Sequence, residues 1–439
     1  MKRLDLLAAA AFVLGVASLA FLAGFFDGKN QSFLYPELKA AEDTTRGLWN
    51  AYLDTPSYVA PGRPGTPART QARVHDAARV APGATFVVGY TPEGFRAWLV
   101  DAQGTKLHEW RARFSDVFPK PTHLLWQARD LVIAWHGTRL LPDGDIVFNF
   151  QDNNFPYGSG LVRLDKNSRV VWALARNTHH DVAVAEDGAF WVPSQRYRPE
   201  GLPGFPSLKP WYYEDTILKV SPEGEVLDEI SVLEALRDFR GVLSVTYSQL
   251  RPIWANDPLH LNSVQPLPAA WAGRFPGLAA GDLLVSLRNT NMLAVIDPKT
   301  RKAKRFVTGP FVQQHDADFL PDGHLMVYDN HGGDPACGGT RVLEFDPATL
   351  ATAWQYGACR DGGMSSDTRG MQTVLPNGNV LTLDPYQGRV LEVTHDPEPE
   401  LVWEYRNVIG AESDGTPLAG MILHAERVLE EALAFLPTS

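Results

Sequence analysis

The sequence of 439 residues predicts an all-β fold, a six-bladed β-propeller preceded by an N-terminal transmembrane helix. The main observation is a repeated turn in which Asp-Gly or Asn-Gly stands between two apolar stretches and favours a hairpin. This turn occurs at Leu141–Gly144, Ala185–Gly188, Leu320–Gly323 and Leu375–Gly378. Four-stranded meanders recur around these turns at roughly 45–80 residues, and strand repeats of this kind are typical of propellers.

The meanders predict six blades. They begin near Thr85, His136, His180, His260, His315 and Gly370. The first strand of each blade is expected to lie innermost, beside the central channel. The first blade shows only three clear strands, at Thr85–Tyr90, Arg96–Val100 and Lys106–Arg111. We expect Met421–Val428 to complete this blade and to close the ring.

The N-terminus carries an apolar run of 21 residues, Leu6–Phe26, after Lys2 and Arg3. At about 1.5 Å per residue this run spans a bilayer, and the basic flank predicts that the N-terminus stays inside. A cleavable signal peptide is the alternative, because Ser18-Leu19-Ala20 fits a cleavage site. In both cases the body is exported. We expect a single-pass inner-membrane protein with its propeller in the periplasm.

Three segments are expected along the chain: residues 1–30 as an anchor or uncleaved signal, 31–80 as a Pro- and Gly-rich linker, and 81–439 as the propeller. One helix is expected in the linker, around Ala40–Leu53.

The net charge of −11 argues against a nucleic-acid partner, because no excess of cations exists to neutralise phosphates. In an exported protein Cys337 and Cys359 are expected to form a disulfide, and no histidine pattern near them indicates a zinc site.

The repeat brings several histidines into one register. His136, His180 and His315 each stand eight residues before a turn glycine, and His260 begins the inner strand of the fourth blade. Arg288 ends the second strand of that blade, so all five are expected at one mouth of the channel. Arginine and histidine are suited to binding an oxyanion, and histidine can also act as a nucleophile.

The alternative for each single histidine is structural, namely a side chain that caps a backbone carbonyl at the end of a strand. Four histidines at one rim favour a functional site. His179 is expected to point away from His180, and Asp181 and Asp316 are expected to accept hydrogen bonds from backbone amides. Aromatic side chains in loops near this mouth either stack on a substrate or pack on one another. They are Phe155, Tyr157, Trp211, Tyr212 and Tyr213.

An ordered set of motifs resembles the bacterial aryl-sulfate sulfotransferases, which are six-bladed periplasmic propellers. The motifs are His179-His180-Asp181, Asp257-Pro258-Leu259-His260-Leu261-Asn262, Leu284-Val285-Ser286-Leu287-Arg288, Gln314-His315-Asp316 and Tyr328-Asp329-Asn330, within roughly residues 80–410. The resemblance implies transfer of a sulfuryl group from an aryl sulfate to a phenol. It implies no nucleotide sulfate donor, no metal and no other cofactor. The chain is expected to depart from the best-known members, because a linker is expected where they have an N-terminal β-sandwich domain.

The resemblance also implies roles for individual residues. His315 would be the nucleophile that is transiently sulfated, and His180, His260, Asn262 and Arg288 would bind the sulfuryl oxygens. His136, the remaining histidine of the register, is expected to contact the substrate. His180 or His260 could take the proton of the acceptor phenol.

Two other functions remain open. The first is a non-catalytic periplasmic scaffold in an envelope complex, whose protein partner the sequence does not identify. The second is a metal-dependent hydrolase with three histidines around the ion, which is disfavoured because an arginine among the ligands would repel a cation. A quinone-dependent dehydrogenase is not indicated, because its repeated tryptophan motifs are missing.

Overall fold

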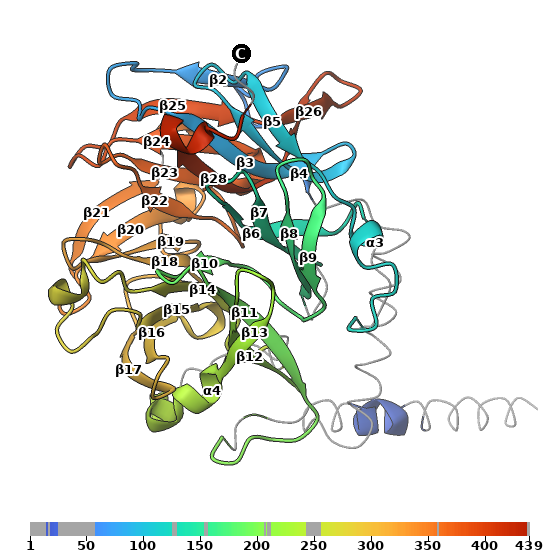
Figure 1. The fold of residues 1–439 in the computed structure, drawn as a ribbon, viewed down its shortest axis with the longest axis vertical. Helices are drawn as coiled ribbons and strands as arrows, with labels where there is room; N and C mark the ends of the chain where they lie inside the picture. The colour runs from blue at the N-terminus through green and yellow to red at the C-terminus, as the bar shows by residue number, and fades with distance from the viewer. Residues whose placement is uncertain are drawn as a thin grey trace, which may run out of the picture.

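The computed structural model describes residues 58–124, 130–152, 157–205, 208, 212–242, 256–357 and 360–436, together with residue 15 and residues 18–24. The described chain is dominated by β-strands, in six sheets of four or five strands and one sheet of three (Figure 1). The expected all-β class is therefore confirmed.

The first three large sheets are antiparallel meanders. Sheet 1 contains β28 (Ile422–Val428), β3 (Ala84–Thr91), β4 (Gly94–Val100) and β5 (Lys106–Trp110). Sheet 2 contains β6 (Ala134–Leu140), β7 (Ile146–Gln151), β8 (Gly158–Leu164) and β9 (Val170–Leu174). Sheet 3 contains β10 (Ala183–Val184), β11 (Phe190–Arg198), β12 (Tyr212–Val220) and β13 (Val226–Ser231).

The remaining sheets follow in chain order. Sheet 4 contains β14 (Leu261–Pro266), β15 (Leu283–Leu287), β16 (Met292–Asp297) and β17 (Lys302–Val307). Sheet 5 contains β18 (His315–Phe319), β19 (Leu325–Asp329), β20 (Arg341–Phe345) and β21 (Thr352–Gly357). Sheet 6 contains β22 (Gln372–Val374), β23 (Val380–Asp384), β24 (Arg389–Val393), β25 (Leu401–Arg406) and β2 (Gln71–Val74). The small sheet contains β1 (Val59–Pro61), β27 (Pro417–Gly420) and β26 (Val408–Ala411).

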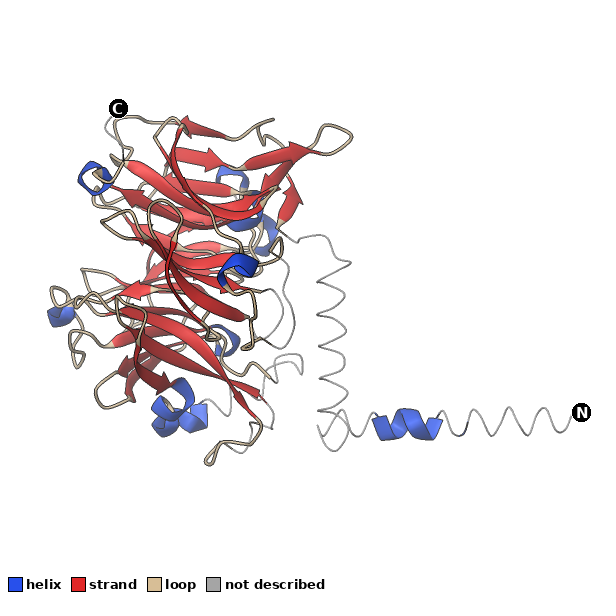
Figure 2. Cartoon of the chain, turned by 45° about the vertical axis from the view of Figure 1, so that its right-hand side comes forward, coloured by secondary structure: helices blue, strands red, loops and turns tan. Residues whose placement is uncertain are grey.

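Apart from the helical residues 18–24, the helical elements of the described chain are short, and all but the last of them lie in the connections between strands (Figure 2). Two are α-helical turns, α3 (Phe114–Val117) and α4 (Val232–Ala235). The others are 3-10 turns: η1 (Arg237–Phe239), η3 (Ala272–Arg274), η4 (Arg288–Thr290), η5 (Pro335–Cys337), η6 (Arg360–Gly362), η7 (Pro385–Gln387) and η8 (Glu430–Leu433).

The central strands are buried on both faces because each sheet is covered by its neighbours. Every residue of β7 is buried, whereas the outer strand β9 has exposed and half-buried positions. Strands covered on both sides read as nearly continuous apolar runs. For example, Trp135 and Phe148 of sheet 2 stack with ring centroids 4.1 Å apart and share a core cluster with Phe86 and Leu99 of sheet 1.

Hydrogen bonds join each sheet to the next. The donor and acceptor pairs are Trp110 Nε1 to Gly144 O, Asn149 Nδ2 to Asp181 O, Val264 N to Asp181 Oδ2, Ala317 N to Ser263 Oγ, Gln372 N to Asp316 Oδ2 and Ala425 N to Met371 Sδ. The last pair returns from sheet 6 to sheet 1, so the six sheets surround a central channel as propeller blades do. Asp181 and Asp316 accept from backbone amides, as the sequence analysis expected.

The ring is closed by the C-terminal strand. β28 pairs with β3 and forms the channel-side strand of sheet 1, beside residues of β6 and β22 (Figure 1). The stretch Met421–Val428 therefore completes the sheet as expected. The expectation that Thr85–Tyr90 is the innermost strand is wrong, because β28 occupies the channel side of β3.

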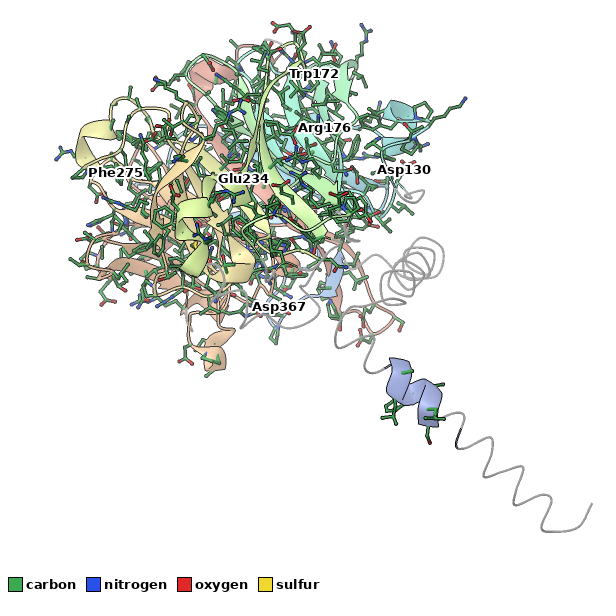
Figure 3. The ribbon with its side chains drawn as sticks, turned by 90° about the horizontal axis from the view of Figure 1, so that it is seen from below. Asp130, Trp172, Arg176, Glu234, Phe275 and Asp367 are labelled. Atoms are coloured by element: carbon green, nitrogen blue, oxygen red, sulfur yellow. The ribbon has the colours of Figure 1, made fainter. Side chains whose placement is uncertain are left out.

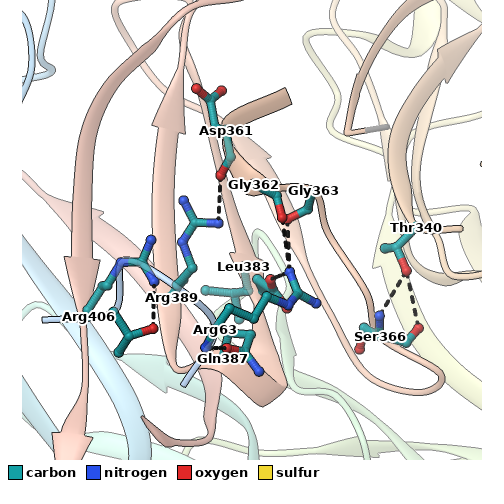
Figure 4. Close-up of polar contacts among 12 residues, drawn as sticks. Arg63, Thr340, Asp361, Gly362, Gly363, Ser366, Leu383, Gln387, Arg389 and Arg406 are labelled. Atoms are coloured by element: carbon teal, nitrogen blue, oxygen red, sulfur yellow. Dashed lines mark hydrogen bonds and ion pairs between the residues drawn. The ribbon is translucent and has the colours of Figure 1, made fainter. Parts of the chain in front are cut away.

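Part of the expected linker belongs to the folded body. β2 adds a fifth strand to sheet 6 by pairing with β25, and β1 pairs with β27. Arg63 Nη1 donates to Asp384 Oδ2 at 3.0 Å and to Gly363 O at 3.1 Å (Figure 4). The expectation of a linker is therefore wrong for residues 59–61 and 71–74, since strand pairing stabilises them. The helix expected around residues 40–53 lies outside the described residues.

Most of the predicted membrane helix also lies outside the described residues. Residues 18–24 are helical, and the described chain contains no helix both long and apolar enough to cross a membrane. Cys337 is buried in η5, close to Gly363, and no free cysteine occurs in the described chain. Cys359 is not among the described residues, so its pairing with Cys337 stays a prediction.

Candidate functional site

A cavity of about 310 Å³ lies at one mouth of the channel, where the inner strands of sheets 3 to 5 begin. His180 stands three residues before the first residue of β10, His260 immediately precedes β14, His315 opens β18, and Arg288 opens η4. These four predicted residues all line the cavity. The complete lining is Gln151, Asp152, Tyr157, His180, His260, Arg288, His315, Thr368, Arg369 and Tyr386.

The backbone at these strand starts is irregular. His180 and His260 have φ values of 58° and 56°, in the left-handed region that disfavours residues with a Cβ atom. β18 contains a register shift between His315 and Ala317, and Asp316 has a φ of 47°. Such conformations cost free energy and persist where the surrounding structure imposes them, often at functional sites. Here they turn three imidazoles toward one space.

The three imidazoles are close together. The ring centroid of His180 lies 4.9 Å from that of His260 and 6.4 Å from that of His315, and the last two are 6.5 Å apart. One ring nitrogen from each histidine lies within 4.8 Å of the other two. A small tetrahedral group could therefore contact all three.

The tautomer of His315 follows from its hydrogen bonds. Asn330 Nδ2 donates to the carbonyls of Ser366 and Arg369, each at 2.8 Å, so Asn330 Oδ1 faces His315. This oxygen lies 2.7 Å from His315 Nδ1 and requires a proton on that nitrogen. The lone pair of a neutral His315 then resides on Nε2, which accepts from Arg369 N at 3.2 Å.

Burial lowers the pKa of His315 well below its ordinary value, and the positive charge of Arg288 lowers it further. The imidazole is therefore neutral at neutral pH. A neutral imidazole is a nucleophile, whereas an imidazolium is not. In this structure the Nε2 lone pair accepts from Arg369 N, so that hydrogen bond must break before Nε2 can attack.

His260 has a different partner. Its Nδ1 lies 2.5 Å from Oδ2 of the buried Asp257, whose backbone carbonyl accepts from Asn289 Nδ2 at 2.7 Å. A carboxylate on Nδ1 orients the ring and stabilises the imidazolium form. His260 is therefore the histidine of this group best suited to take up and release a proton.

His179 contacts His180, contrary to the expectation that it points away. The two Nδ1 atoms lie 2.8 Å apart, because the left-handed backbone at His180 brings the neighbouring rings together. Burial lowers the pKa of His179 to about 3, so this residue is neutral. One nitrogen of the pair must then donate to the other, which fixes the orientation of the His180 ring.

Arg288 is buried, with an exposed fraction of 3%. Its guanidinium donates to Asp367 O at 3.1 Å, to Asn289 Oδ1 at 3.2 Å and to Gln313 Oε1 at 3.4 Å. Figure 3 labels Asp367 at the rim of the molecule. Hydrogen bonds to neutral oxygens hold the guanidinium in place, and a fixed buried cation is effective at binding an oxyanion.

His136 and Asn262 do not line this cavity but lie deeper in the channel. They line a second cavity of about 280 Å³ in the channel, and His180 and His315 line both cavities. His136 Nδ1 is 2.5 Å from His180 O, and Asn262 Nδ2 donates to Gln314 O at 2.8 Å. The structure thus places these two predicted residues under the histidine group, where they contact its backbone.

Loops of sheet 6 contribute residues that the sequence analysis missed. Thr368 Oγ1 lies 2.8 Å from the Tyr386 hydroxyl, and the Arg369 guanidinium lies 5.9 Å from the Tyr386 ring. No repeat or motif signal marked them.

Of the predicted aromatic residues, Tyr157 lines the cavity, with its ring centroid 5.2 Å from that of His260. Tyr212 and Tyr213 do not line the cavity, whereas Phe155 and Trp211 lie outside the described residues.

The histidine group also meets a geometric requirement for a metal site. Three imidazoles and an open position are a common zinc environment, and Asp257 and Asn330 are suitable outer partners for two of them. The nearby guanidinium of Arg288 opposes a cation and favours an anion. The charge of the site therefore favours an anionic ligand.

The family model described as Arylsulfotransferase (ASST) matches residues 137–408. No curated protein sequence matches the chain. Among solved structures, a protein of unknown function from Bacteroides caccae is similar, with 15% identity, a TM-score of 0.45, and coverage of 78% of this chain and 98% of that one. A streptogramin B lyase has 12% identity, a TM-score of 0.41, and coverage of 82% and 98%. The WD40 β-propeller domain of Doa1 has 10% identity, a TM-score of 0.41, and coverage of 83% and 97%.

Proposed function

The chain belongs to the arylsulfotransferase family, and from this we propose that it transfers a sulfuryl group from an aryl sulfate ester to a phenol through a sulfohistidine. We propose His315 as the nucleophile and no nucleotide sulfate as donor. One observation carries this assignment. The hydrogen bond from His315 to Asn330 puts the lone pair of the neutral ring on Nε2, and His315 lines a cavity that also contains a buried arginine.

In the first step Nε2 of His315 attacks sulfur, and the bond between sulfur and the aryl oxygen breaks. The electron pair leaves with that oxygen, and His260 can protonate the departing phenolate. In the second step His260 takes the proton of the acceptor phenol, whose oxygen attacks sulfur as the N–S bond breaks. Sulfuryl transfer resembles phosphoryl transfer, so Arg288 and His180 contribute by positioning the peripheral oxygens and stabilising their charge.

The size of the cavity favours small substrates. A volume of about 310 Å³ lies at the lower end of the range for small-molecule sites. Tyr157 and Tyr386 provide aromatic surface on its wall. We therefore propose phenols and aryl sulfates with a single ring as the substrate class.

The proposal is tested with the full chain in detergent and 4-nitrophenyl sulfate as donor. Release of 4-nitrophenol is expected to depend on an added phenol, and the sulfated phenol is expected to appear in equal amount. If a folded protein releases no nitrophenol with a panel of acceptors, the sulfotransferase proposal fails. The alternative of a non-catalytic scaffold would then be favoured.

Replacement of Arg288 with alanine is expected to reduce turnover by about 10²–10³-fold, the range found for the loss of one oxyanion donor. The measurement is kcat/KM for 4-nitrophenyl sulfate. Arg176→Ala is a matched control, because Arg176 pairs with Glu229 at 2.9 Å away from the cavity (Figure 3). Equal losses in both variants would contradict a specific role for Arg288.

The rate of His315 sulfation is expected to stay constant as the pH falls from about 8 to about 5. Burial and the charge of Arg288 lower the pKa of His315 well below its ordinary value and so preserve its neutral form on acidification, whereas a histidine of ordinary pKa would lose about 30-fold of its neutral form over this range. The measurement is the single-turnover rate with 4-nitrophenyl sulfate, whose leaving group needs no proton. A decline centred near pH 6.5 would show that His315 titrates normally.

A second candidate function is metal-dependent hydrolysis, which is favoured only by the mutual approach of the three histidine nitrogens. Dialysis against a chelator distinguishes the two candidates. Sulfuryl transfer as proposed survives chelation, whereas hydrolysis by a bound ion is lost and returns with added Zn²⁺.

We also propose that the protein is a six-bladed propeller held at the inner membrane by residues 1–30, with the body in the periplasm. The apolar run at residues 6–26 supports this location. Cell fractionation with protease protection of spheroplasts tests it. The body should be digested from outside, while an N-terminal tag stays protected.

A further inference from the structure

A second cluster of metal-ligating side chains lies at the opposite end of β18 from His315. Asp322 and His324 stand in the turn between β18 and β19, and Glu344 lies in β20 (Figure 1). One ligand atom from each of these residues lies within 4.8 Å of the other two. The cluster is separate from the cavity, which lies at the start of β18.

The atoms of the cluster face one another. His324 Nδ1 lies 2.6 Å from Glu344 Oε1 and 3.1 Å from Asp322 Oδ2. The other oxygen of Asp322 accepts from the backbone N of His324 at 3.0 Å, which fixes the orientation of this carboxylate. The turn therefore presents one nitrogen and one oxygen toward the carboxylate of Glu344.

His395 supports the cluster from the neighbouring sheet 6. Its Nε2 lies 2.6 Å from Glu344 Oε2, and its ring lies perpendicular to that of Trp354 at 4.8 Å. Because Oε2 of Glu344 contacts His395, the other carboxylate oxygen, Oε1, faces His324. Such outer partners are typical of carboxylates that bind metal ions.

The local charge favours a cation. Asp322 and Glu344 belong to the cluster, and Asp346 adds negative potential at His324. Glu344 is only 4% exposed, and its two oxygens have the imidazoles of His324 and His395 as partners, so the position beside Oε1 already suits a positive charge. A divalent ion would supply that charge at the centre of the cluster.

We propose that Asp322, His324 and Glu344 bind a divalent transition-metal ion of the Zn²⁺ class, with water as the fourth ligand and His395 orienting Glu344. One imidazole and two carboxylates suit such ions, whereas Ca²⁺ and Mg²⁺ take oxygen ligands.

Tetrahedral ligands at about 2.0–2.2 Å from the metal lie roughly 3.3–3.6 Å apart. The observed contacts must therefore widen by roughly 0.2–1 Å. The side chains of His324 and Asp322 have room to move, since they are 33% and 55% exposed.

Equilibrium dialysis of the full chain against Zn²⁺, followed by metal analysis, tests the site. The His180→Ala chain is used throughout, because His180, His260 and His315 form a second group that could bind zinc. We expect one zinc ion per chain. His324→Ala should weaken its binding by about 100-fold or more, and His395→Gln should weaken it by about 10–100-fold. His108→Ala, which changes a half-buried histidine of β5 outside the cluster, should leave it unchanged.

Two results would overturn the proposal: no zinc bound by the His180→Ala chain, or zinc affinity that is the same with and without His324. Asp322→Asn is the milder variant, because Asp322 lies in an exposed turn. It should abolish the zinc-dependent rise in melting temperature without unfolding the chain. These measurements need no turnover, so their outcome does not depend on the proposed sulfuryl transfer.

Discussion

Alanine at position 315 is expected to reduce acceptor-dependent nitrophenol release by about 10⁴-fold or more, the scale of loss found when a covalent nucleophile is removed. The physical reason is the hydrogen bond to Asn330, which fixes the proton of His315 on Nδ1 and leaves the lone pair on Nε2. Among the described histidines that line the cavity, only His315 has a side-chain amide as the partner of Nδ1. Steady-state turnover of 4-nitrophenyl sulfate measures the effect. His108→Ala is the matched control, since that half-buried ring of β5 bonds Lys166 O and does not line the cavity.

Two further readouts separate chemistry from misfolding in the His315 variant. Donor incubated with the unaltered chain and no acceptor should leave one SO₃ group on the peptide that contains His315, detectable by mass spectrometry. The variant should not acquire it, and free imidazole should restore part of the turnover. Modification on a different histidine would move the nucleophile to that residue.

Replacement of Asp257 with asparagine is expected to slow transfer to a weakly acidic phenol by about 10²–10⁴-fold, the range of general acid–base contributions. The asparagine keeps the shape of the side chain but removes the negative charge that stabilises protonated His260. The initial burst of nitrophenol should persist, because the weakly basic 4-nitrophenolate leaves without a proton. Rapid-quench kinetics resolves the burst from the later transfer.

This selective effect distinguishes acid–base catalysis from general damage. A series of acceptors should show the defect growing as the phenol becomes less acidic. Asp238→Asn, at an exposed carboxylate, serves as the control. If burst and transfer fall by the same factor, Asp257 acts on the structure of the site and not on proton transfer.

The sheets could be predicted from the sequence because their signal is local. Each Asp-Gly or Asn-Gly turn lies within a few residues of the strands that it joins, and the histidine register follows from counting back from its glycine. The role of β28 was harder to predict, since the strand pairs with β3 at the other end of the chain.

The partners of the histidines could not be predicted in the same way. Asn330 faces His315 because two carbonyls of the segment 366–369 hold its amide, and that segment comes from a different connection. Arg369 and Tyr386 reach the cavity from sheet 6 without any repeat signal. Contacts between loops of different sheets depend on the closed ring, which no local pattern describes.

The C-terminal position of β28 has a consequence for biosynthesis. The channel-side strand of sheet 1 is made long after its partner β3, and Arg427 bonds Ala81 across 346 positions. Sheet 1 must therefore wait, with one edge of β3 uncovered, until residues 422–428 have been translated. Contacts of such long range slow folding, and uncovered edges promote aggregation. A nascent chain that stops short of residue 422 would expose this edge permanently and become a substrate for quality-control proteases.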